Sequence, residues 1–161
     1  MRVMTGQFYF TTLAGIALSV AGFASLITAL RGDGHWSSTD LWRLRNILSE
    51  SLTIVVFAVV PFPIFYAAGG DEALTIRIVS GLIALNFARR IWGTFGERQE
   101  WGGRYVAQVV VIVGTQTVGH IANIWLASLP LLMVGLLAWL IFPIQLFLRV
   151  IRDFHPPAAG D

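Results

Sequence analysis

Four polar side chains interrupt one long apolar stretch of this chain: Gln108, Gln116, His120 and Asn123. Their successive offsets of 8, 4 and 3 residues place them on one face of a helix, and Thr117 lies beside that face. Hydrocarbon offers no water to such groups, so we expect this polar stripe to turn toward other helices or toward water. Two interpretations stay open. The stripe forms hydrogen bonds between helices, or it lines a permeation path or a small-ligand pocket.

His120 is the histidine of this stretch, and an imidazole titrates close enough to neutral pH to gate or relay protons. Haem or a metal ion would need further ligands, whereas His35 and His155 lie outside the apolar stretches. We therefore expect no metal and no cofactor. The sequence also has no paired carboxylates in an apolar stretch, no recognisable nucleophile and base, and no phosphate-binding glycine motif. It predicts that the protein is not an enzyme.

The composition predicts an all-α membrane protein. The 161 residues are 56% hydrophobic and 12% charged, with a mean hydropathy of +0.72, whereas soluble domains carry roughly 25% charged residues. The 11 basic residues are all arginines, and their clusters flank the apolar stretches. They indicate topology signals and headgroup contacts rather than a nucleic-acid partner. The absence of lysine suggests a GC-rich bacterial genome.

The apolar stretches predict a polytopic bundle of transmembrane helices. Residues 8–30 and 51–68 contain no charge and have about the 20 residues that a bilayer core requires. Residues 105–148 also contain no charge, and as one helix they would be about 66 Å long. We expect this stretch to turn at Ala127–Pro130, which gives spans 105–126 and 129–150.

Residues 73–91 are the uncertain span, because Arg77 lies inside it and Arg89 and Arg90 close it. Five spans place 9 arginines on one side of the membrane and 2 on the other, whereas four spans give a split of 8 to 3. Cytoplasmic enrichment of arginine favours five spans, with the N-terminus outside and the C-terminus in the cytoplasm. We interpret residues 1–161 as one integral domain of a bacterial inner membrane, four spans being the alternative.

Three features accompany the spans. Ser37–Asp40 offers capping side chains to an amphipathic interfacial helix at 40–48 that runs into the second span. Glu50 lies near the inner end of that span, where an ion pair or hydration among headgroups is expected. The tail 153–161 contains two prolines and is predicted to be disordered.

Two further sets of residues are candidates for binding. In the first span Gly15, Ser19 and Gly22 recur at helical spacing, and such small residues allow close helix packing. The partner of that face can be another span or a second protomer. Arg77 either extends toward Asp71 and Glu72 or points into the bundle as part of an anion-attracting vestibule.

These observations favour a small channel or transporter, oligomeric, with its polar path along the span 105–126. The alternative is a non-catalytic membrane subunit or scaffold that packs against other transmembrane helices. The expected partners are the lipid bilayer and either further copies of the chain or other membrane subunits.

Single cysteines can test the number of spans, because the chain contains none of its own. Five spans place Gly34 and Gly102 on the same side of the membrane, whereas four spans place them on opposite sides. We expect Gly34→Cys and Gly102→Cys to react equally with an impermeant maleimide in inverted vesicles and to be protected in whole cells. Opposite labelling of the two variants would establish four spans.

Overall fold

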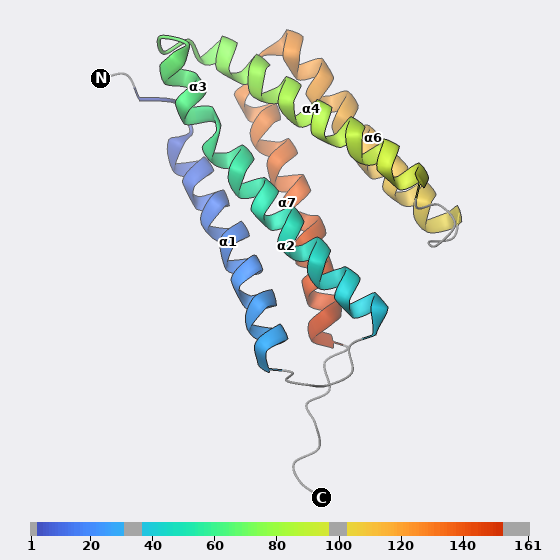
Figure 1. Cartoon of the computed structure of the whole chain (residues 1–161). Helices are drawn as coiled ribbons and strands as arrows, with labels where there is room; N and C mark the ends of the chain where they lie inside the picture. The colour runs from blue at the N-terminus through green and yellow to red at the C-terminus, as the bar shows by residue number, and fades with distance from the viewer. Residues whose placement is uncertain (1–2, 31–36, 97–102, 153–161) are drawn as a thin grey trace, which may run out of the picture. The chain divides into compact units, whose positions relative to one another are not determined.

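The computed structural model describes residues 3–30, 37–96 and 103–152, and within these ranges every regular element is an α-helix (Figure 1). The helices are α1 (Gln7–Leu30), α2 (Ser38–Val59), α3 (Pro61–Ala67), α4 (Glu72–Gly96), α6 (Gly103–Leu126) and α7 (Leu129–Arg152). The all-α prediction is confirmed for these residues. The predicted disorder of residues 153–161 concerns a segment outside the described ranges.

Three helical stretches are long and apolar enough to cross a membrane: Gln7–Ala29, Ser38–Ala67 and Leu129–Arg152. A shorter apolar helical stretch covers Val110–Leu126 of α6. Helix α4 is not among the long apolar stretches, and it carries the three arginines that make the span at 73–91 uncertain from sequence.

Residues 38–59 form one continuous helix, so the predicted interfacial segment at 40–48 is the first part of α2 rather than a separate helix. No glycine or proline interrupts this stretch, and nothing in its sequence breaks the backbone hydrogen bonds. The break comes later, where α2 ends at Val59 and α3 begins at Pro61. Proline lacks an N–H group and suits a first helical turn, which explains this position.

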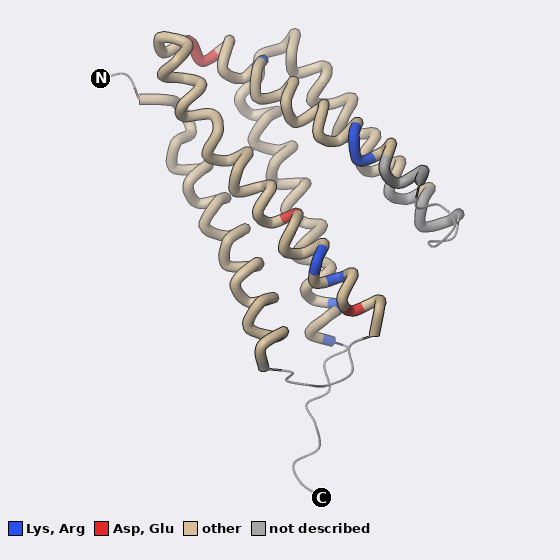
Figure 2. The backbone as a smooth tube through the Cα atoms, viewed as in Figure 1, with Lys and Arg blue, Asp and Glu red and all other residues tan. Residues whose placement is uncertain are grey.

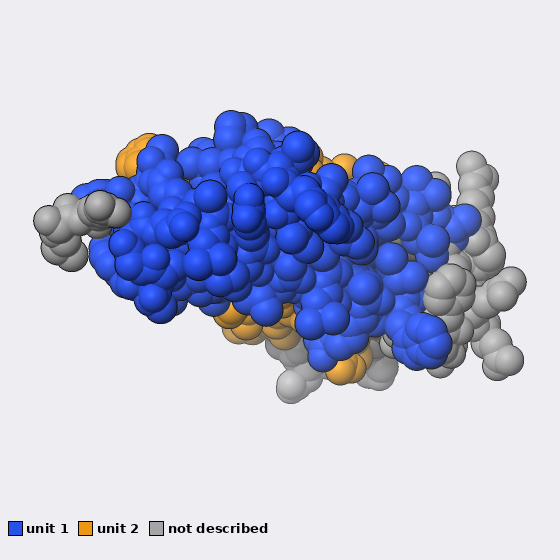
Figure 3. All heavy atoms as spheres, turned by 90° about the horizontal axis from the view of Figure 1, so that it is seen from above, with its two compact units in different colours: residues 1–7, 59–135 blue, residues 8–58, 136–161 orange. Residues whose placement is uncertain are grey.

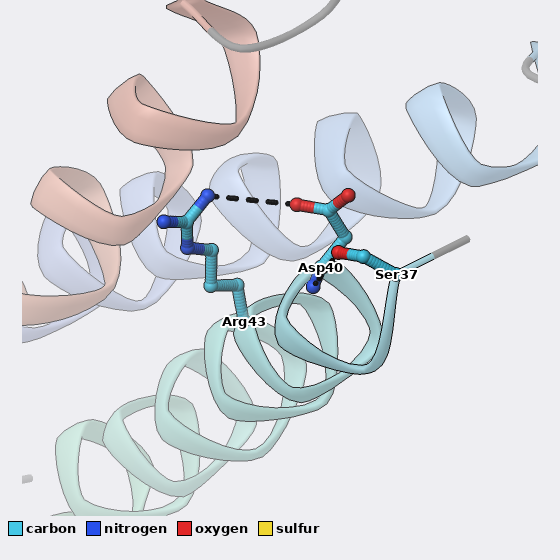
Figure 4. Close-up of polar contacts among 3 residues, drawn as sticks. All are labelled: Ser37, Asp40 and Arg43. Carbon is cyan, nitrogen blue, oxygen red and sulfur yellow. Dashed lines mark hydrogen bonds and ion pairs between the residues drawn. The ribbon is translucent and has the colours of Figure 1, made fainter. Parts of the chain in front are cut away.

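The start of α2 is capped as its sequence predicts (Figure 4). The Ser37 hydroxyl oxygen accepts a hydrogen bond from the Asp40 backbone N–H at 3.1 Å. The Asp40 carboxylate also faces the Arg43 guanidinium at 3.5 Å, one turn along the helix. An acidic side chain in a first turn complements the positive end of the helix dipole. These contacts fix the point at which the chain enters α2.

The contacts of the chain divide it into two units, coloured separately in Figure 3. Unit 1 comprises residues 1–7 and 59–135, and unit 2 comprises residues 8–58 and 136–161. Unit 1 therefore holds α3, α4, α6 and the start of α7, whereas unit 2 holds most of α1 and α2 and the rest of α7.

Unit 2 has an apolar cluster to which three helices contribute. The buried members are Val20 and Ala24 of α1, Leu44 and Ile47 of α2, and Leu146 and Val150 of α7. Arginines of α2 and α7 gather at the same end of this unit, namely Arg43, Arg45, Arg149 and Arg152 (Figure 2). Such a grouping is expected of arginines that share one membrane face.

In unit 1, α4 packs along α6, and α3 also contacts α4. Between α3 and α4, Gly69 and Gly70 adopt φ angles of 65° and 86°, which favour glycine. Asp71 follows, and its carboxylate accepts a hydrogen bond from the Leu74 N–H at 2.9 Å. The turn between α6 and α7 lies where the sequence predicts it, with Ala127 at a φ angle of 47°.

The Asp71 cap provides a stability test. Asp71→Ala leaves the Leu74 amide without its capping oxygen, so we expect the free energy of unfolding to fall by about 1 kcal/mol. Asp71→Asn keeps an acceptor and should remain close to the unchanged protein. Unfolding in mixed micelles measures both variants, and equal stability of the alanine variant would contradict this role for the cap.

Candidate functional site

The polar stripe of α6 lies largely on its buried side. Asn123 and His120 are buried, and Gln116 is half-buried, whereas Val118 and Ile121 on the same helix are exposed. The residues that sequence periodicity groups together are therefore turned toward protein. Gln108 also lies in α6, but its side chain falls outside the described residues.

The Asn123 amide connects three segments of unit 1. Its Oδ1 accepts a hydrogen bond from the Ser128 backbone N–H at 2.9 Å. This contact assigns the amide orientation, and Nδ2 then donates to the Ser80 hydroxyl of α4 at 3.0 Å. Asn123 thus joins α6 to α4 and to the turn that leads into α7. Both the oxygen and the nitrogen of this amide therefore form hydrogen bonds within unit 1.

His120 lies one turn before Asn123 in a different environment. The side chain is only 3% exposed, and its ring stacks on Phe87 of α4 with centroids 6.1 Å apart and an interplanar angle of 28°. No hydrogen-bond partner for Nε2 lies among the described residues. A buried polar atom without a partner costs about 1–3 kcal/mol. This nitrogen is thus a group that the fold buries but does not satisfy.

Gly135 of α7 makes room for the imidazole. A Cβ atom at this glycine would lie 2.7 Å from His120 Nε2 and 2.8 Å from Cε1, closer than such contacts allow. The same position would lie 3.6 Å from Gln116 Oε1. An imidazole nitrogen and an amide oxygen therefore face one backbone position that carries no side chain. We call His120, Gln116, Phe87 and Gly135 the His120 site.

Thr117 and Arg77 are the other predicted pathway residues whose side chains the structure describes. The Thr117 hydroxyl donates to the Val113 carbonyl of its own helix at 2.8 Å. Arg77 is exposed on α4, whereas Ile76, Val79 and Ser80 of that helix are buried. The structure therefore places Arg77 on the outer side of α4.

The face of α1 that carries Gly15, Ser19 and Gly22 is exposed in the part of the chain that the structure describes. A Cβ atom at Gly15 or at Gly22 would have no heavy atom within 4 Å, and the Ser19 hydroxyl donates to the Gly15 carbonyl at 2.9 Å. Packing against a helix outside the chain stays a prediction for this face.

Unit 2 contains a polar contact that sequence reasoning did not find. Glu50 is 4% exposed, and its Oε2 accepts a hydrogen bond from Trp139 Nε1 at 2.8 Å. The expectation of a carboxylate hydrated among headgroups is therefore wrong for Glu50. The sequence signals were present, because Trp139 lies in mid-span and Glu50 adjoins an apolar stretch. Nothing in the sequence indicates that the two residues meet.

The described residues contain no group of three or more His, Cys, Asp or Glu side chains that could hold a metal ion. Comparisons with protein-family models, with curated proteins and with solved structures give no match.

Gly135→Ala tests the geometry of the His120 site. The added methyl group meets a buried ring that stacks on Phe87, so we expect a loss of about 1–3 kcal/mol in the free energy of unfolding. Gly119→Ala is the matched control, because its Cβ atom would have no heavy atom within 4 Å.

Combining Gly135→Ala with His120→Ala removes the ring that the methyl group meets. The cost of the glycine substitution should then nearly disappear, and a double-mutant cycle in micelles measures this coupling. Independent effects of the two substitutions would contradict the contact.

Proposed function

We propose that this protein is a small membrane channel or transporter whose polar path passes the His120 site. The observation that carries the proposal is the buried His120 Nε2, which has no hydrogen-bond partner among the described residues and lies beside a glycine that leaves room for its ring. Unsatisfied polar groups in apolar surroundings are costly, and in membrane proteins they mark pathways for ions and polar solutes.

The chemistry of the site supports protons or small polar solutes as the transported species. A neutral imidazole has one nitrogen that donates a hydrogen bond and one that accepts, so it can bind a polar solute or relay a proton between two partners. Gln116 Oε1 supplies an acceptor beside the same glycine. Asn123 already binds Ser80 and Ser128 and holds the helices in register. His120 and Gln116 are therefore the residues that contact the solute in this proposal.

The membrane arrangement belongs to the same proposal. Five helical stretches cross the inner membrane of a bacterium, α4 and α6 adding to the three long apolar ones, with the N-terminus outside and the C-terminus in the cytoplasm. The support is the grouping of Arg43, Arg45, Arg149 and Arg152 at one end of unit 2, as cytoplasmic arginines would group (Figure 2).

A second candidate function is a non-catalytic membrane subunit or scaffold. The observation that favours it is the exposed small-residue face of α1, where Gly15 and Gly22 have open space at their Cβ positions. Small residues at this spacing let a helix from another protein or a further copy approach closely. In this case the protein contributes contacts and carries no flux.

Flux through proteoliposomes tests the first function. Loss of one strong hydrogen bond to a solute costs about 1.5–3 kcal/mol, so His120→Leu and Gln116→Leu should each reduce flux about 10- to 100-fold. Dyes sensitive to pH and to membrane potential report the movement of protons, K⁺, Na⁺ and Cl⁻ down imposed gradients.

Thr115→Val is the matched control for the flux measurement. Thr115 precedes Gln116, is exposed, and donates its hydroxyl to the Val111 carbonyl of its own helix at 2.8 Å. This variant should keep full flux. Equal flux in the leucine variants would reject the path. A co-purifying helix that is lost in Gly22→Leu would then support the scaffold function.

A further inference from the structure

Four arginines lie at one end of unit 2, namely Arg43 and Arg45 of α2 and Arg149 and Arg152 of α7 (Figure 2). Asp40 lies beside them, where its carboxylate faces the Arg43 guanidinium at 3.5 Å. Helix α1 carries no charged residue, and the other acid of α2, Glu50, is buried farther along that helix. Among the described residues, this end of the unit therefore carries more positive than negative charge.

The side chains of Arg45 and Arg149 are open to a partner outside the chain. Both are exposed, and neither forms an ion pair or a hydrogen bond with another described residue. They border on the same apolar cluster, because Arg45 follows Leu44 and Arg149 precedes Val150, and both of these neighbours are buried in it. The packing of this cluster therefore brings two exposed guanidinium groups to one end of the unit.

Exposed apolar side chains continue from these two arginines along their helices. In α2, Leu52 and Val56 follow Arg45 by two and three helical turns, and they are 50% and 55% exposed. This spacing keeps them on the face of α2 that carries Arg45. In α7, Ile141 and Leu148 precede Arg149 and are 50% and 57% exposed. Each helix thus combines a charged end with an apolar outer side.

The length of the apolar face on α2 matches one leaflet of a membrane. The helix rises about 17 Å from Arg45 to Val56, and half of a hydrocarbon core measures about 15 Å. A molecule that complements both the charge and the apolar face has an anionic head and apolar chains of about one leaflet in length. An anionic phospholipid has this form. A soluble phosphate ester has no such chains, so it can use only the charged end.

We propose that the arginine end of unit 2 is a binding site for anionic phospholipids. The Arg45 and Arg149 guanidinium groups donate hydrogen bonds to phosphate oxygens of the headgroup, a geometry that suits their planar donors. Acyl chains lie along the exposed apolar sides of α2 and α7. Arginine clusters beside membrane helices attract anionic headgroups in this way. The proposal requires that the long apolar helices of unit 2 lie in a membrane, and it does not depend on flux through the His120 site.

Native mass spectrometry of the protein in an uncharged detergent tests the proposal, because it counts the lipids that each chain retains. The probes are phosphatidylglycerol and phosphatidylcholine with identical acyl chains, and we expect tighter retention of phosphatidylglycerol. An arginine near a membrane surface raises the affinity for anionic lipid about fivefold, so Arg45→Gln and Arg149→Gln should each weaken its retention about fivefold. The measurement requires no transport, so selective retention by a protein without flux would uphold this inference while rejecting the channel.

Arg89→Gln is the matched control, because Arg89 is an exposed arginine of α4 in unit 1 and the variant loses the same charge. It should retain phosphatidylglycerol as the unchanged protein does. Equal retention of the two lipids by the unchanged protein would overturn the proposal, and so would an equal loss in all three variants. Displacement of phosphatidylglycerol by an equal concentration of glycerol phosphate would also overturn it, in favour of a site for soluble phosphate esters. All the substituted side chains are exposed, and unfolding in the same detergent checks that each variant folds.

Discussion

The two hydrogen bonds of the Asn123 amide are the polar contacts that connect the segments of unit 1. It accepts a hydrogen bond from the Ser128 N–H at the turn before α7 and donates one to Ser80 of α4. Both partners are required, because a buried amide without them would lose its hydration and gain nothing in return. These two hydrogen bonds link α6 to α4 and to the turn before α7.

His120 lies one turn from Asn123, and the contrast between the two defines the candidate site. Both are buried polar residues of the same helix face, yet Asn123 has two partners in the fold and His120 Nε2 has none among the described residues. Packing alone would favour an apolar residue at position 120. The fold instead accommodates the imidazole with a stacking ring on α4 and a glycine on α7. Burying the imidazole in this way costs stability, and in the proposed function the ring is available to a polar solute.

Unit 2 also contains a buried polar pair whose two members form a hydrogen bond with each other. Burying Glu50 or Trp139 alone would leave a polar group without a hydrogen bond. The indole N–H of Trp139 instead donates to one oxygen of the Glu50 carboxyl group, so this oxygen needs no water. Around them the helices meet through apolar side chains, and the arginines gather toward one end of the unit. Each unit therefore contains a buried titratable side chain in apolar packing, namely His120 in unit 1 and Glu50 in unit 2.

The sequence by itself determined the helical character of the apolar stretches, the turn at residues 127–128, the cap at Ser37 and the buried face of α6. These features depend on local spacing, on proline and glycine, and on a helical period that groups Gln116, His120 and Asn123. Tertiary structure alone decided which residues meet, such as Asn123 with Ser80, His120 with Gly135 and Glu50 with Trp139. Periodicity gives the face of a helix but not its neighbour, and a serine or a glycine in an apolar stretch does not indicate its partner. For that reason the polar stripe was predictable, whereas the unsatisfied nitrogen and the buried carboxyl group were not.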